Sequence, residues 1–259
     1  MKRSWVRFPI TAHIVPVTFY KKLGETSFGA IQRFREENPE YKDEKIAFAG
    51  RLDPMAEGEM LFLTGEETKR KEDFLGMDKV YETEFVFGIE TDSHDLMGSI
   101  QKIQNTPIEQ SAIEKNILER TGKQKQKFPA FSKRHVQGKA MFVWAAEGRL
   151  NEIEIPEHEV EIYSIEILHN GEKTFGEIRD NAVTRISDVV GDFRQEQLIN
   201  EWNKNPTDVT ERFQTITLKV FCSTGTYIRQ LAQDIGTDLG CGATVFSIKR
   251  TAIIQKKTQ

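Results

Sequence analysis

Two stretches of the chain alternate apolar and polar side chains residue by residue, a spacing that an extended strand with one buried face produces. The first runs from Lys79 to Ile89 and places Tyr81, Thr83, Phe85, Phe87 and Ile89 on one face. The second runs from Thr215 to Cys222 and places Ile216, Leu218, Val220 and Cys222 on one face. Half-exposed strands of this kind are typical of antiparallel sheets, because strands buried in parallel sheets read as near-continuous apolar runs.

Helical periodicity appears before the first of these strands and after the second. The segment from Ser27 to Glu37 repeats apolar side chains at helical spacing, and so does a helix that begins after Gly225 and ends near Leu239. In the second helix Arg229 lies about 160° around the axis from Leu231, at roughly 100° per residue, so we expect it to point away from the core. Interleaved helices and half-exposed strands predict an α+β fold, with a mixed, mostly antiparallel central sheet, flanking helices and a catalytic cleft.

Further strands are expected at residues 59–64, 159–168 and 245–254. Between residues 169 and 213 the pattern loosens, and we interpret this segment as an insertion that carries one helix. With 259 residues, the chain is expected to form a single domain over residues 1–259.

Composition narrows the class of protein. Hydrophobic residues make up 38% and charged residues 29%, as in soluble globular proteins, and no run of 18 apolar residues could span a membrane. The two cysteines, Cys222 and Cys241, cannot form a disulfide framework or a four-cysteine zinc site. We therefore expect a cytoplasmic protein without a metal or an organic cofactor.

The charge is unevenly distributed. A net charge of −4 argues mildly against nucleic-acid binding. The stretch from Thr121 to Lys139, however, contains no acid and six bases: Lys123, Lys125, Lys127, Lys133, Arg134 and Lys139. The acids gather later, between Glu152 and Glu161. This basic stretch could contact phosphates, although a solvated basic loop is the plainer interpretation.

One acidic residue stands out by its setting. Asp53 follows Gly50 by three residues and precedes Pro54, so it should lie on a tightly defined loop. Its neighbours Leu52 and Met55 are apolar, and a carboxylate that faces a dry pocket needs a cationic partner to stay ionised. From these residues alone, a turn residue or helix cap is the more common role.

The segment from Ala49 to Gly58 resembles the nucleophile motif of pseudouridine synthases, and other segments resemble the TruB family in particular. They are Lys21–Phe28 (KKLGETSF), Gly65–Lys69, Asp78–Tyr81, Thr91–Asp95, Phe128–Ser132, Gln137–Lys139, Cys222–Arg229 and Leu239–Ala243. The matches keep the family's order and cover roughly residues 21–168 and 214–255. The segment Cys222–Arg229 is the most specific of them.

The resemblance implies roles for individual residues. Asp53 matches the nucleophile, Arg229 the arginine that pairs with it, and Tyr81 the tyrosine that lies against the target base. The alternatives are a solvated helix arginine for Arg229 and an ordinary core aromatic for Tyr81. A guanidinium that forks onto Asp53 would keep the carboxylate ionised.

Six more positions are implied to bind substrate: Lys21, Phe48, Asp95, Lys133, Lys139 and Ile248. Ile248 matches an apolar position that lines the base pocket. Asp95 could contact the flipped base or belong only to a turn, and a metal site formed by His94 with two aspartates lacks further ligands. Phe48 stands where the family has a histidine, and a phenylalanine can stack there but cannot hydrogen-bond.

The resemblance implies an RNA pseudouridine synthase whose target is a loop uridine, most simply uridine-55 of the tRNA T loop, and which works as a monomer. The family's C-terminal RNA-binding PUA domain has no room after the segment that ends at Ala243. One alternative is an RNA-folding module with weak or no catalysis, and another is a synthase with a different RNA target. A glycoside hydrolase would need a second carboxylate roughly 5 to 9.5 Å from the first, and only Glu57 lies near Asp53 in sequence.

Overall fold

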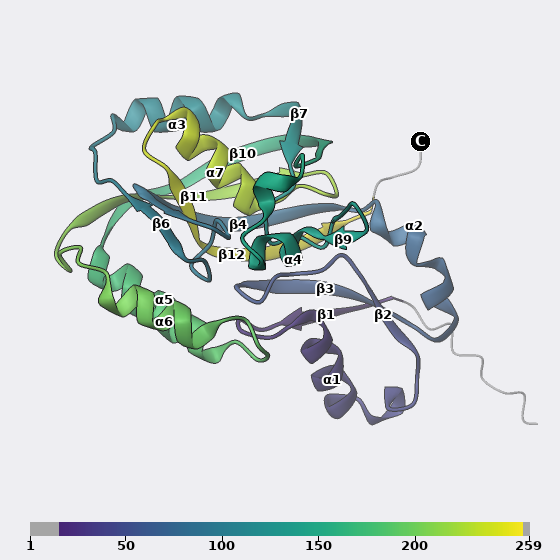
Figure 1. Cartoon of the computed structure of the whole chain (residues 1–259). Helices are drawn as coiled ribbons and strands as arrows, with labels where there is room; N and C mark the ends of the chain where they lie inside the picture. Colours follow the sequence, from purple (N-terminus) through teal and green to yellow (C-terminus); the bar gives the residue numbers. More distant parts are fainter. Residues whose placement is uncertain (1–15, 256–259) are drawn as a thin grey trace, which may run out of the picture.

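The computed structural model describes residues 16–255, which form a central eight-stranded sheet with helices on both faces (Figure 1). The strands pair in the order β1-β3-β12-β4-β11-β10-β7, and β2 also pairs with β3. Their bounds are β1 Val17–Lys21, β2 Ile46–Ala49, β3 Ala56–Thr64, β4 Asp78–Phe87, β7 Gly122–Lys127, β10 Glu157–Thr174, β11 Arg212–Cys222 and β12 Ala243–Ile254. Two small hairpins lie outside this sheet: β5 Ile89–Thr91 with β6 Ile100–Ile103, and β8 His135–Val136 with β9 Lys139–Ala140.

The sheet is mixed and mostly antiparallel, as the sequence predicted. Among the described strands of this sheet, β12 pairs with β3 in parallel and every other pair is antiparallel. The two alternating stretches of sequence lie side by side as β4 and β11, with Tyr81 opposite Val220 and Phe85 opposite Ile216. All four of these side chains are buried, so the apolar faces predicted for both strands are confirmed.

Seven α-helices and three short 3₁₀ turns complete the described part of the chain. The helices are α1 Ser27–Glu37, α2 Lys71–Leu75, α3 Gln110–Glu119, α4 Met141–Ala146, α5 Phe175–Asp188, α6 Gln195–Lys204 and α7 Ile228–Asp238. The 3₁₀ turns are η1 Pro39–Tyr41, η2 Gly65–Arg70 and η3 Leu150–Glu152.

Each face of the sheet has its own apolar core. Phe85 and Phe87 of β4 pack in one core with apolar residues of α1, α3 and α7. Val86, which points the other way because side chains alternate along a strand, packs with those of α5 and α6. Figure 1 shows α3 and α7 on one side of the sheet and α5 and α6 on the other.

The segment from 169 to 213 differs from the prediction. It begins and ends as sheet, because β10 runs on to Thr174 and β11 begins at Arg212, and between them it carries two helices rather than one. The helix that was missed is α5, which begins with a capping box: the Thr174 side chain accepts from the Glu177 backbone and the Glu177 side chain accepts from the Thr174 backbone. A threonine followed three residues later by a glutamate, ahead of a helical apolar pattern, could have revealed it.

Candidate active site

The loop that carries Asp53 joins β2 to β3 and is held by two buried cations. From one side, Lys21 Nζ donates to the carbonyl oxygens of Pro54 (3.4 Å) and Ala56 (2.5 Å). From the other, the Arg250 guanidinium donates to the carbonyl oxygens of Gly50 and Arg51, each at 3.2 Å. Gly50 itself has φ +82°, a conformation that glycine adopts without strain.

Asp53 forms an ion pair with Arg229 at the start of α7. Arg229 Nε lies 2.8 Å from Asp53 Oδ2, the arginine side chain is 4% exposed and the aspartate side chain is 46% exposed. The aspartate therefore has one oxygen fixed by the guanidinium while the carboxylate still faces solvent. Arg229 Nε also lies 3.7 Å from Oδ2 of the buried Asp95.

Two backbone carbonyls fix the rest of the guanidinium. Arg229 Nη1 donates to Ser93 (2.6 Å) and Nη2 donates to Phe131 (3.3 Å). Burial by itself lowers the pKa of Arg229, but the carboxylates of Asp53 and Asp95 raise it above its ordinary value. The guanidinium is thus a permanent positive charge with little freedom to turn.

Arg229 lies off the apolar face of α7, as predicted, but it is buried rather than exposed to solvent. Its position on α7 does lie far around the helix from Leu231, but the loops that contain Ser93 and Phe131 cover that face as well. The helix is buried on two sides, which a helical projection of its own residues cannot reveal. A solvated helix arginine is therefore excluded.

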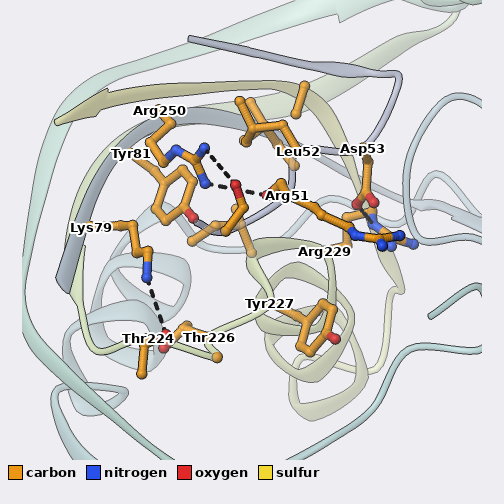
Figure 2. A pocket seen from close by; sticks show the side chains of 15 residues that line it. Arg51, Leu52, Asp53, Lys79, Tyr81, Thr224, Thr226, Tyr227, Arg229 and Arg250 are labelled. Carbon is orange, nitrogen blue, oxygen red and sulfur yellow. Dashed lines mark hydrogen bonds and ion pairs between the residues drawn. The ribbon is translucent and has the colours of Figure 1, made fainter. Parts of the chain in front are cut away.

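A cavity of about 230 Å³ opens beside the ion pair (Figure 2). Pockets for drug-sized ligands are roughly 300–1,000 Å³, so this one suits a single pyrimidine nucleoside. Its lining includes Asp53, Tyr81, Arg229 and Ile248, four residues that the sequence analysis had selected. The other lining residues are Gly50, Arg51, Leu52, Ala56, Lys79, Thr224, Gly225, Thr226, Tyr227, Ile228 and Arg250.

Tyr81 and Ile248 supply apolar surface to this cavity. Tyr81, on β4, is 8% exposed and Ile248, on β12, is 7% exposed. Burial raises the pKa of the Tyr81 hydroxyl, although the nearby Arg250 lowers it. The hydroxyl therefore keeps its proton near neutral pH and can donate or accept a hydrogen bond.

Five of the six residues predicted to bind substrate lie outside the lining of this cavity, and three of these five are buried behind or beside it. Lys21 is fully buried behind the Asp53 loop, where it holds backbone carbonyls. Asp95 lies beneath Arg229 and accepts from Ser93 Oγ (2.6 Å) and the Met97 backbone (3.0 Å). Phe48 is 6% exposed and packs edge-on against Phe28 at 5.4 Å between ring centroids. The first two position the machinery of the pocket, and Phe48 supports a surface next to it.

Lys133 and Lys139 have different surroundings. Lys133 is exposed overall. The part of its side chain that is buried, and then the charge of Arg51, lower its pKa, while the charge of Asp53 raises it. Lys133 thus lies within electrostatic range of the ion pair. Lys139 instead binds Glu147 at 2.8 Å and lies 4.3 Å from the Trp144 ring, so its charge is already matched.

The acidic and basic stretches that are separate in sequence meet in the sheet. Strand β7 pairs with β10 so that Lys127 faces Glu157, Lys125 faces Glu159 and Lys123 faces Glu161. Side chains opposite each other on paired strands share one face, and opposite charges there attract. The expectation that the whole stretch from Lys123 to Lys139 contacts phosphates is therefore not supported for its first three lysines.

Eleven of the lining residues had not been selected from the sequence, among them Lys79, Thr224, Tyr227 and Arg250. Lys79 Nζ donates to Thr224 Oγ1 at 3.1 Å, and Arg250 is 1% exposed. Burial raises the pKa of the Tyr227 hydroxyl. Lys79, Thr224 and Tyr227 belong to segments that resemble the family motifs, so their positions beside Tyr81 and Arg229 were the available indication. For Arg250 the only indication in the sequence was a charged residue within an expected strand.

Residues 16–255 contain no group of three or more histidine, cysteine, aspartate or glutamate side chains placed to hold a metal ion. No helix in that same range is both long and apolar enough to cross a membrane.

The fold and the pocket define the class of protein. Chains from the crystal structure of a Cbf5-Nop10-Gar1 complex and from that of the archaeal box H/ACA sRNP Nop10-Cbf5 complex superpose with TM-scores of 0.55 and 0.53. The first is 17% identical, and the match covers 91% of this chain and 48% of the other. The second is 18% identical, and the match covers 98% of this chain and 52% of the other. The architecture is thus the α+β pseudouridine synthase fold.

The family follows from the sequence. The family described as TruB family pseudouridylate synthase (N terminal domain) matches residues 39–185, more than half of the chain, and this protein belongs to that family. The tRNA pseudouridine synthase B of Clostridium kluyveri is 29% identical and that of Caldicellulosiruptor saccharolyticus 30% identical, each over 89% of this chain. The chain spans 64% of the length of both relatives.

Proposed function

We propose that this protein converts a uridine in an RNA loop into pseudouridine, and that uridine-55 of the tRNA T loop is its preferred target. The observation that carries this proposal is the 2.8 Å ion pair between Arg229 and a half-exposed Asp53, beside a nucleoside-sized cavity lined by Tyr81 and Ile248. An acid held in this way, next to an aromatic ring and an apolar wall, suits attack on a flat pyrimidine nucleotide.

The reaction breaks the bond between N1 of the base and C1′ of the sugar, turns the base, and rejoins it through C5. Asp53 could add covalently to the sugar or the base, or remove a sugar proton while the detached base turns. Tyr81 would stack against the base, and its hydroxyl could take the C5 proton while its own proton passes through solvent to the freed N1. Uridine and pseudouridine are isomers, so the reaction consumes no oxidant, reductant or second substrate.

The choice of a tRNA is supported by the names of the curated relatives, both called tRNA pseudouridine synthase B. A loop uridine must leave its stack to reach the cavity, at a cost of a few kcal/mol. Contacts with the RNA backbone and neighbouring bases would supply that energy. We further propose that the sheet and its helices act as one catalytic domain.

The test is the substitution Asp53→Asn, which keeps the shape of the side chain and removes its charge. We expect release of tritium from a tRNA transcript whose uridines are tritiated at C5 to fall below detection, while binding of the same transcript stays within about tenfold of the wild-type value. The loss follows because a carboxamide is neither a nucleophile nor a base at neutral pH. Full tritium release by the variant would remove Asp53 from the mechanism, and no release by the wild-type protein would refute the function.

A further inference from the structure

Helix α1 displays an aromatic ring to solvent beside the catalytic loop. Phe28 is 61% exposed, although it shares the helical spacing of the buried Ile31 and Phe34. Its neighbour Ser27 is buried, and Ser27 Oγ accepts from the Leu52 backbone N–H (3.3 Å) and lies 3.1 Å from the Leu52 carbonyl oxygen. Phe28 therefore directly follows a residue that is fixed to Leu52, and Leu52 directly precedes Asp53.

The Arg51 guanidinium lies beside this ring, and Lys71 lies beside the neighbouring ring of Phe48. The Arg51 guanidinium lies 5.9 Å from the Phe28 ring centroid and 5.2 Å from that of Phe48, and Lys71 Nζ lies 5.6 Å from that of Phe48. Arg51 also lines the catalytic cavity, so one side chain borders both places. Lys133 feels the charge of Arg51, which adds positive potential on the same side.

An exposed aromatic ring with cationic neighbours has the composition of a nucleobase platform. Any base offers a π-face that stacks on an aromatic ring or a guanidinium, and the neighbouring cations attract the phosphates that join the bases. A protein partner would also accept an apolar ring, but Arg51 beside it, together with Lys71 and Lys133 on the same side, favours a polyanion.

We propose that Phe28 and Arg51 form a second stacking site, which holds an unpaired base of the RNA next to the flipped uridine. This inference rests on the proposed function and names a further part of the substrate. The site would bind the neighbouring base after the target has left the helix or loop stack, which stabilises the opened form of the RNA.

The experiment combines a protein variant with altered RNA. Phe28→Ala and Phe28→Trp are made in the Asp53→Asn background so that binding is measured without turnover, and Leu118→Ala on α3, 51% exposed, is the matched surface control. The probe is a T-arm stem–loop, and a series of the same RNA carries a single abasic site at each nucleotide that flanks the target uridine.

We expect Phe28→Ala to weaken binding of the intact stem–loop roughly five- to a hundredfold, as for other base–aromatic stacks. Phe28→Trp and Leu118→Ala should stay within about twofold of the background. At one abasic position the difference between the background protein and its Phe28→Ala variant should disappear, because the stacked base is already missing. The inference is overturned if every abasic RNA keeps the full difference, or if Phe28→Ala binds as tightly as the background.

Two measurements separate this inference from its premises. Wild-type protein that releases no tritium from the stem–loop contradicts the proposed function, whereas an active wild type with a neutral Phe28→Ala contradicts only the stacking site. Sedimentation of the wild type and of Phe28→Ala over a range of concentrations tests whether the exposed ring binds a second copy of this protein instead. Self-association that the substitution abolishes would assign the ring to a protein contact and overturn the inference.

Discussion

At the scale of single residues, two buried cations show how this protein uses charge away from the solvent. Arg229 faces Asp53, Asp95 and two carbonyls, so its charge is matched and its orientation is fixed. Lys21 instead donates its hydrogen bonds to backbone carbonyls within the described part of the chain. A charge solvated by dipoles alone is less stable than one with a counter-ion, so Lys21 should be the more sensitive of the two to pH.

Lys21 leads to a prediction about stability. Burial lowers the pKa of Lys21 from 10.5 to about 8, although Glu25 and Asp53 raise it. Between those two pH values the unfolded chain binds a proton that the native protein does not, so the free energy of unfolding increases with pH. Relative to Lys21→Met, the wild type should gain up to about 3 kcal/mol from pH 7 to pH 10.

Urea unfolding of both proteins at intervals of one pH unit measures this difference. Below about pH 8 the cost of the buried charge is fully present in the wild type, and it diminishes as the pH rises from about 8 toward 10.5. Subtracting the variant's curve removes the titration of the remaining groups. If the free energy of unfolding changed with pH in the same way for both proteins, Lys21 would have the same pKa in the native protein as in the unfolded chain.

At the scale of elements, the hairpin of α5 and α6 supports the active site from outside the catalytic loop. Arg194, at the start of α6, lies 3.3 Å from Asp92 Oδ2, and its guanidinium lies 4.7 Å from the Phe131 ring centroid. Asp92 precedes Ser93, and the carbonyls of Ser93 and Phe131 are the two that hold Arg229. We therefore propose that Arg194 is a positioning residue that acts through both supports of Arg229.

Arg194 has φ +64°, a conformation that costs a residue with a side chain about 1 kcal/mol. Arg194→Gly relieves this strain and removes the contacts with Asp92 and Phe131. We expect the free energy of unfolding to stay within about 1 kcal/mol of the wild-type value, while kcat for tritium release falls roughly tenfold, as a small misplacement of a catalytic group can cause. Unfolding in urea and initial-rate kinetics measure the two effects.

Arg179→Ala is the matched control, because Arg179 lies on the same hairpin and pairs with its neighbour Asp180. It should leave both kcat and KM unchanged. A proportional loss of stability and rate in Arg194→Gly would instead mean that Arg194 serves the fold alone.

At the scale of the whole molecule, the distribution of charge decides where an RNA can bind. The protein carries a net charge of −4, and register in the sheet sets three lysines of β7 opposite three glutamates of β10. Arg51 lines the cavity and lies beside the exposed Phe28, Lys71 lies beside Phe48, and Lys133 lies within electrostatic range of Arg51 and Asp53. We expect phosphates to bind there rather than along β7.

The dependence of RNA binding on salt tests this distribution. Lys133→Ala should lower the slope of log Kd against log salt concentration by about one unit between roughly 50 and 200 mM salt, since one phosphate contact is lost. Lys125→Ala should leave the slope unchanged, because Lys125 faces Glu159. Equal reductions by both substitutions would place the phosphates along β7 as well.

The sequence by itself determined several elements of the fold and four residues of the pocket lining. Alternation at Tyr81 and Ile216 fixed buried strands because a side chain's face depends only on local backbone geometry, and Asp53, Tyr81 and Arg229 could be selected because their motifs are short and contiguous. The tertiary structure alone decided that Arg229 is buried, that Lys125 faces Glu159, and that Phe28 remains exposed. Each of these depends on which distant segment covers a given face, and that is set by the packing of the whole chain.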